Sequence, residues 1–86
     1  MHDPEAKKAM DARLARIEGQ VRAVRRMIDE DVECEAIAQQ LAAARKALDR
    51  AFYEMVACMI RADPPAAASA RRERAGQVGE LLARFA

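Results

Sequence analysis

Apolar residues recur along the chain at alternating steps of four and three, the spacing that places side chains on one side of an α-helix. The first such stripe consists of Met10, Leu14, Ile17, Val21, Val24 and Ile28. It predicts a helix over roughly residues 5–29, which ends in an acidic cluster. Within that cluster Asp31 is a candidate N-cap for the next helix, because a carboxylate accepts hydrogen bonds from the free amides of a first turn.

A second stripe with the same alternation predicts a longer helix over roughly residues 32–62. Its members are Ile37, Leu41, Ala44, Leu48, Ala51, Met55, Cys58 and Ala62. The prolines in residues 63–65 end this helix, since proline lacks an amide hydrogen and clashes with the preceding turn. A weaker apolar side predicts a third helix over roughly residues 68–85, which Gly76 and Gly79 destabilise. No segment has the alternation of a strand.

Two long helices joined by a short turn form an antiparallel hairpin, which cannot close a core by itself. The chain has only 86 residues, and 21 of them are alanine. A chain of this size buries little surface even with a good core, and alanine contributes little to one. We therefore expect an all-α fold, a single domain over residues 1–86, whose helices bury apolar faces against other copies of the chain. The small alanines of the second stripe help line the seam and let helices approach closely.

Composition excludes several classes of protein. No apolar run approaches a membrane span, and the N-terminal residues lack the pattern of a signal peptide. Two cysteines cannot form a disulfide framework, so we expect reduced thiols in the cytoplasm and no membrane partner. The sequence has no phosphate-binding loop and no placed acid–base pair, which favours a binding or regulatory protein over an enzyme.

The near-neutral total of 15 basic against 14 acidic residues conceals a segregation of charge. Residues 1–28 carry seven basic and four acidic groups, a net of +3, whereas residues 29–40 carry five acids and no base. In the hairpin, the basic parts of the two helices can lie side by side. One interpretation is an ordinary solvated face. The other is a phosphate-binding surface, since each neutralised phosphate releases counterions.

Three stretches carry a resemblance to a known family. The run RLARIEGQVRAVRRM over 13–27 resembles the first helix of the CsoR/RcnR/FrmR repressors, and so do the single Cys34 after the turn and residues 39–46. Residues 80–85, ELLARF, are similar to the closing helix of these proteins. The resemblance implies a three-helix protomer, a dimeric four-helix bundle and a homotetramer built as a dimer of dimers. It also implies binding to operator DNA and release by an inducer, which across the family is copper(I), nickel, cobalt, formaldehyde or reactive sulfur species such as persulfides.

The resemblance also assigns residues to DNA binding. The matching positions are Arg13 and Arg16 on the first helix and Arg45 on the second, with Lys8 and Lys46 as further candidates. Except for Lys8, these residues belong to the basic segments of the two long helices, which the hairpin places side by side. No cofactor is expected to be required for DNA binding itself.

Cys34 falls on the position of the family's sensor cysteine. A helix start suits this role, because the positive end of the helix dipole favours the thiolate that binds metals or attacks electrophiles. The neighbouring Glu33 and Glu35 oppose that effect. The alternative is a small buried side chain at the start of a helix.

Where metal-sensing members carry a histidine and a further ligand, this chain has Met59 and Asp63. Both lie about 37 Å or more along the helix from Cys34, so they would meet the cysteine of an antiparallel second chain. The missing histidine disfavours nickel and cobalt, whereas the thioether of Met59 is a soft ligand that suits copper(I). The alternative is that Met59 only packs.

Two further residues, Cys58 and His2, are candidates for the sensor site, and each has two possible roles. Cys58 is either a packing residue of the second stripe or a partner for Cys34 of another copy, since the distance excludes a disulfide within one chain. His2 lies at the spacing of an N-terminal ligand in the nickel and cobalt branch, or belongs to a disordered terminus. Pro4 is not N-terminal, so the proline amine used by the formaldehyde branch is missing.

The predicted function is an inducer-responsive repressor, and the alternative is a metal or sulfur carrier, or a helical assembly module, that does not bind DNA.

Overall fold

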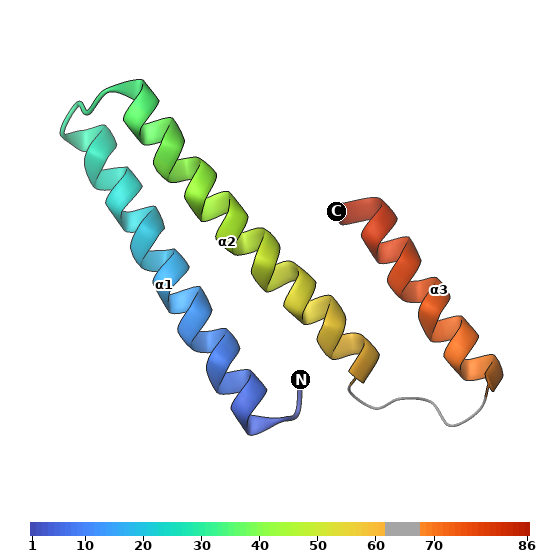
Figure 1. Ribbon diagram of the computed structural model, residues 1–86. Helices are drawn as coiled ribbons and strands as arrows, with labels where there is room; N and C mark the ends of the chain where they lie inside the picture. Colours follow the sequence, from blue (N-terminus) through green and yellow to red (C-terminus); the bar gives the residue numbers. More distant parts are fainter. Residues whose placement is uncertain (62–67) are drawn as a thin grey trace.

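The computed structural model describes residues 1–61 and 68–86, and these residues form three α-helices and no strand. The helices are α1 (Pro4–Asp29), α2 (Cys34–Arg61) and α3 (Ala68–Phe85). Figure 1 shows α1 and α2 as an antiparallel hairpin, with α3 alongside the C-terminal half of α2. The all-α prediction is therefore confirmed. Ala62 and Asp63 lie outside the described residues.

The turn between α1 and α2 corrects one sequence prediction. Asp31 is not the N-cap of α2 but the residue that follows the C-cap of α1, Glu30, and its backbone φ of 57° lies in the left-handed region. Its amide donates to the carbonyl of Ile28 at 3.2 Å, and the amide of Val32 donates to the carbonyl of Met27 at 3.0 Å. These two bonds form a Schellman motif, a helix end that usually employs glycine at the position of Asp31. As a consequence α2 begins later than predicted, at Cys34.

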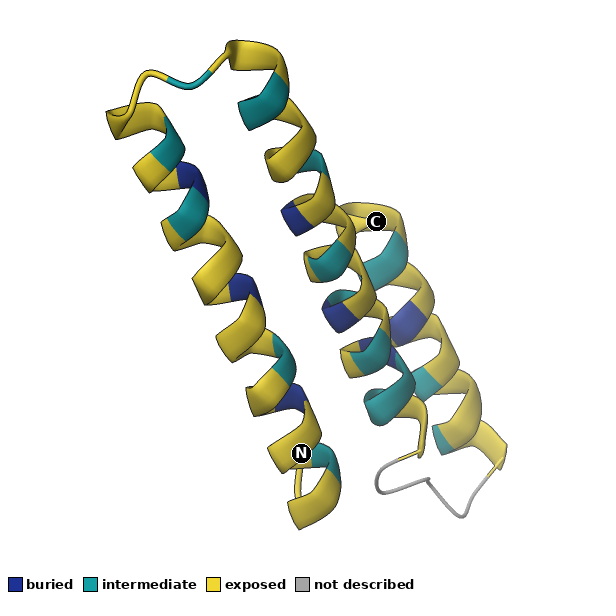
Figure 2. Ribbon diagram, turned by 60° about the vertical axis from the view of Figure 1, so that its left-hand side comes forward, coloured by how far each residue is buried: buried dark blue, intermediate teal, exposed yellow. Residues whose placement is uncertain are grey.

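The seam between α1 and α2 uses only every second residue of the predicted α1 stripe. Met10, Ile17 and Val24, seven residues apart, are buried against α2, where Ala44 and Ala51 are also buried. Figure 2 shows these buried positions facing one another across the hairpin. The alanines let the helices approach closely, as the sequence pattern indicates for these two positions.

The exposed residues of the two stripes form what we call the open apolar face of the hairpin. Its members are Leu14, Val21, Ile28, Leu41, Leu48 and Met55, all of them exposed. The chain exposes 6952 Å² in total, whereas a compact monomer of its mass, 9.5 kDa, exposes about 5,000 Å². The excess has the size of the surface that each chain of an obligate dimer buries.

The third helix is attached to α2 more lightly than α1 is. Val56 of α2 and Val78 of α3 are buried in this part of the chain. The guanidinium of Arg74 donates a hydrogen bond of 2.8 Å to the carbonyl oxygen of Met59, near the end of α2. This bond satisfies one of the free carbonyls that every helix leaves at its C-terminus. No helix in the described residues is long and apolar enough to cross a membrane.

Candidate nucleic-acid interface and sensor cysteine

A basic groove runs between α1 and α2. Its volume is about 290 Å³, close to the lower limit for small-molecule pockets. The side chains along it are Arg13, Arg16 and Gln20 from α1 and Lys46 and Arg50 from α2, with Ile17 and Ala47 beneath. Four of these residues are cationic and none is acidic. An open groove with cations from two helices can bind phosphate groups, because arginine matches phosphate geometry in two-point contacts.

The groove gathers some of the predicted DNA-binding residues and leaves others aside. Arg13, Arg16 and Lys46 line it together. Arg45 and Lys8 are exposed but do not line it. Gln20 and Arg50 also line it, although neither is among the residues predicted to bind DNA. The signal was available, because Gln20 follows Arg16, and Arg50 follows Lys46, by one helical turn.

Arg13 differs from the other cations because it already has an anionic partner. Its Nη2 atom lies 2.8 Å from Oε1 of Glu54 on α2, and the Arg13 side chain is only 24% exposed. Its Nε atom is buried without a hydrogen-bond partner among the described residues. Nε of Arg50 lies 4.0 Å from the same Glu54 oxygen. One carboxylate therefore touches two arginines of the basic groove.

Cys34 is the first residue of α2 and is exposed. It lies in a shallow groove of about 480 Å³ whose other residues are Ile28, Asp31, Val32, Ile37, Ala38 and Leu41. Two of these, Ile28 and Leu41, belong to the open apolar face. The thiol therefore lies at one end of the face that the hairpin leaves uncovered.

The other predicted sensor residues lie at the opposite end of the hairpin. Cys58 and Met59 are half-buried near the end of α2, about 36 Å along the helix from Cys34. His2 precedes α1 and is exposed. Among the described residues, no three His, Cys, Asp or Glu side chains lie close enough to hold a metal ion. One chain alone therefore does not bring Cys34 together with the other candidates.

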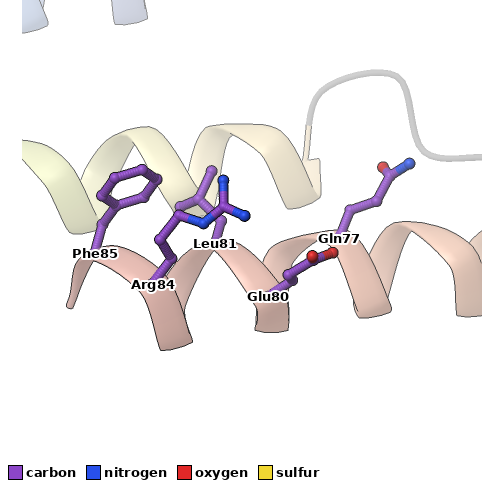
Figure 3. Close-up of a pocket in the computed structure, with 5 residues that line it drawn as sticks. All are labelled: Gln77, Glu80, Leu81, Arg84 and Phe85. Carbon is purple, nitrogen blue, oxygen red and sulfur yellow. The ribbon is translucent and has the colours of Figure 1, made fainter.

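A pocket on α3 is a weaker candidate. It measures about 230 Å³ and is lined by Gln77, Glu80, Leu81, Arg84 and Phe85. Figure 3 shows these side chains on one helix. The guanidinium carbon of Arg84 lies 5.9 Å from the centre of the Phe85 ring. A depression built from a single helix lacks the convergent polar groups of a ligand site.

Comparison with known proteins decides which family this helical chain represents. A family model described as metal-sensitive transcriptional repressor matches residues 6–84. The chain belongs to this family. The family consists of transcriptional regulators and not of enzymes, as the sequence analysis expected.

Individual relatives agree with the resemblance to the CsoR/RcnR/FrmR repressors. The transcriptional repressor RcnR and an RcnR homologue, both from Escherichia coli, are 40% identical to the chain over 55 residues. These matches cover 64% of the chain and 61% of each relative. A solved structure of a variant of the formaldehyde-responsive regulator FrmR from Salmonella enterica serovar Typhimurium matches with a TM-score of 0.83 and 34% identity, over all of both chains. The family resemblance and the helical fold are therefore both confirmed.

Proposed function

We propose that the protein is a transcriptional repressor that binds operator DNA through the basic groove and releases it when an inducer engages Cys34. One observation carries the proposal: the hairpin presents a groove with four cations and separately leaves an apolar face uncovered, with the only exposed thiol of the described residues at its end. Cations suit a phosphate backbone. An uncovered apolar face suits a second copy of the chain.

Assembly forms the first part of the proposal. Two hairpins pair through their open apolar faces into a four-helix bundle, and two such dimers form a homotetramer, with residues 1–86 acting as one domain. The surface in excess of a compact monomer supports this pairing. If the two α2 helices run antiparallel, Cys34 of one chain lies near Cys58 and Met59 of the other, with His2 at the same end. A sensor site completed by two chains explains why the described residues of one chain hold no cluster of metal ligands.

DNA binding forms the second part. In a dimer paired through the apolar faces, the basic grooves stay free for phosphates, because Leu14, Val21 and Leu48 line a different groove from Arg16 and Lys46. Arg45 and Lys8 are exposed and extend the contact surface. No cofactor is needed for this step. A role on operator DNA and reduced thiols both support a location in the cytoplasm.

The inducer is the third part. The soft sulfur donors Cys34, Cys58 and Met59 favour copper(I) over nickel or cobalt as a metal inducer. The exposed cysteine side chain at position 34 also suits formaldehyde or reactive sulfur species, and the similar regulator FrmR is formaldehyde-responsive. Either kind of inducer changes how α2 packs on the second chain. It releases DNA only if it binds the DNA-free conformation more tightly than the DNA-bound one.

Fluorescence anisotropy tests the DNA-binding step. A labelled duplex from upstream of the protein's own gene is titrated with protein over a series of salt concentrations. We expect binding with a steep salt dependence, and we expect Arg16→Ala to lower the magnitude of the log–log salt slope by about 0.9 for each chain that contacts DNA.

Arg72→Ala is the matched control, because it removes the same charge from an exposed position on α3. It should leave the affinity and the slope nearly unchanged. Absence of binding at low salt contradicts the proposal and favours the metal or sulfur carrier, or the assembly module, instead.

A further inference from the structure

Glu54 of α2 is the acid that contacts the basic groove. Its Oε1 atom lies 2.8 Å from Nη2 of Arg13 and 4.0 Å from Nε of Arg50. The contact with Arg13 spans 41 residues of sequence and is the one ion pair in the described residues that joins α1 to α2. Glu54 therefore neutralises part of the groove that the proposed function assigns to phosphates.

The environment of Arg13 makes this contact more than a surface ion pair. Its side chain is 24% exposed, whereas Arg22 and Arg50, which also have acidic neighbours, are each 73% exposed. The Nε atom of Arg13 is buried and has no hydrogen-bond partner among the described residues. A guanidinium that has lost much of its water binds an anion strongly, and a carboxylate and a phosphate compete for the same donors.

We propose that Glu54 is an internal competitor of DNA phosphate for Arg13 and Arg50. A phosphate that enters the groove must displace the carboxylate before it can bind Arg13. The competition lowers the affinity for DNA and leaves the complex weak enough to be released. This inference rests on the proposed function, because it presupposes that the groove binds DNA.

A purely structural ion pair gives the opposite expectation. If Glu54 only holds α1 to α2 and orients Arg13, then removing its charge should loosen the groove and weaken DNA binding. If Glu54 competes with phosphate, then removing its charge should strengthen DNA binding. The direction of the change in affinity therefore separates the two roles.

Glu54→Gln is the test, because it removes the charge and keeps the size of the side chain. Measured by anisotropy with the same duplex, the variant should bind about fivefold more tightly for each contacting chain, as expected for one additional free cation. The magnitude of the salt slope should rise by up to about 0.9 per contacting chain. Glu73→Gln is the matched control: it removes the same charge from an exposed position on α3 that does not line the basic groove. It should change the affinity by less than about twofold.

A second set of variants tests whether the effect acts through the arginines. In an Arg13→Ala, Arg50→Ala background, Glu54→Gln should no longer strengthen binding. If Glu54→Gln strengthens DNA binding by the same factor in this background, the effect comes from the change in net charge and not from the two arginines, and the inference is overturned. If Glu54→Gln does not fold, Glu54→Asp takes its place, because the shorter side chain keeps the charge but reaches Arg13 less well. It should tighten binding by a smaller factor, and an unchanged affinity overturns the inference.

The two proposals fail in different ways. Wild-type protein that does not bind the duplex at low salt overturns the proposed function, and this inference with it. Wild-type protein that binds, combined with a folded Glu54→Gln variant that binds equally or less tightly, overturns the role of Glu54 alone.

Discussion

Replacing Leu48 by glutamate tests whether the open apolar face is where two chains pair. Leu48 lies on this face and is 48% exposed in the single chain. Burying the remaining half of a leucine side chain is worth about 1 kcal/mol. The six residues of the face are each roughly half exposed, so a pair of chains gains about 12 kcal/mol from covering them. Association itself costs about 4–15 kcal/mol, so the gain from this face is of the same size as the cost.

A glutamate at position 48 removes the contribution of the leucine side chain, about 1 kcal/mol in each of the two chains. It also adds an unpaired charge to each chain. Together these effects cost at least about 4 kcal/mol, which raises the dissociation constant of the pair about a thousandfold. Sedimentation velocity should show a smaller species for Leu48→Glu than for the wild type, and circular dichroism should show a lower unfolding temperature. Val21→Glu, on the same face of α1, should behave in the same way.

Ala43→Glu serves as the control, because it adds the same charge at an exposed position of α2 roughly opposite the line of Leu41 and Leu48. It should keep the wild-type mass. If the assembled species of Leu48→Glu also has the wild-type mass and unfolding temperature, this face does not join the chains, and the reasoning from exposed area is refuted.

Two further predictions concern stability. Asp31→Gly should raise the free energy of unfolding, measured in urea, by about 0.5–1 kcal/mol, because glycine adopts the left-handed backbone of the turn without strain. The control Asp29→Gly lies inside α1 and should lower the free energy of unfolding by about as much. A loss of stability in Asp31→Gly would contradict the assigned turn. Arg74→Met should raise amide hydrogen exchange in α3 and leave the α1–α2 seam protected, because the bond to the Met59 carbonyl attaches α3 to α2. Equal exchange in wild type and variant would show that this bond does not hold α3.

The helices and the family were accessible from the sequence, because both depend on local patterns. Steps of four and three in the apolar residues determine which side of a helix is buried, and they led to α1 and α2 within a few residues of their ends. The start of α2 was predicted too early because Asp31 can cap a helix in two ways. Its side chain can begin the next helix, or its backbone can end the previous one in the left-handed region, and only the structure distinguishes these possibilities.

Two other features could not be read from the pattern. The stripes do not tell which of their residues pack within one chain, and the structure shows that Ile17 is buried in the seam while Leu14 and Val21 are left exposed. The contact between Arg13 and Glu54 joins residues 41 positions apart, and no local rule relates them. From the sequence alone Arg13 is one of several cations, whereas in the structure its guanidinium is held by a carboxylate.

Release of DNA by an inducer, with and without the Cys34 thiol, tests the central claim most directly. The complex of protein and labelled duplex is titrated in separate experiments with copper(I), nickel, cobalt, formaldehyde and polysulfide, for the wild type and for Cys34→Ala. We predict that at least one of these inducers releases DNA from the wild type and that the same inducer leaves the Cys34→Ala complex bound. Release of both proteins at the same inducer concentration would contradict the account.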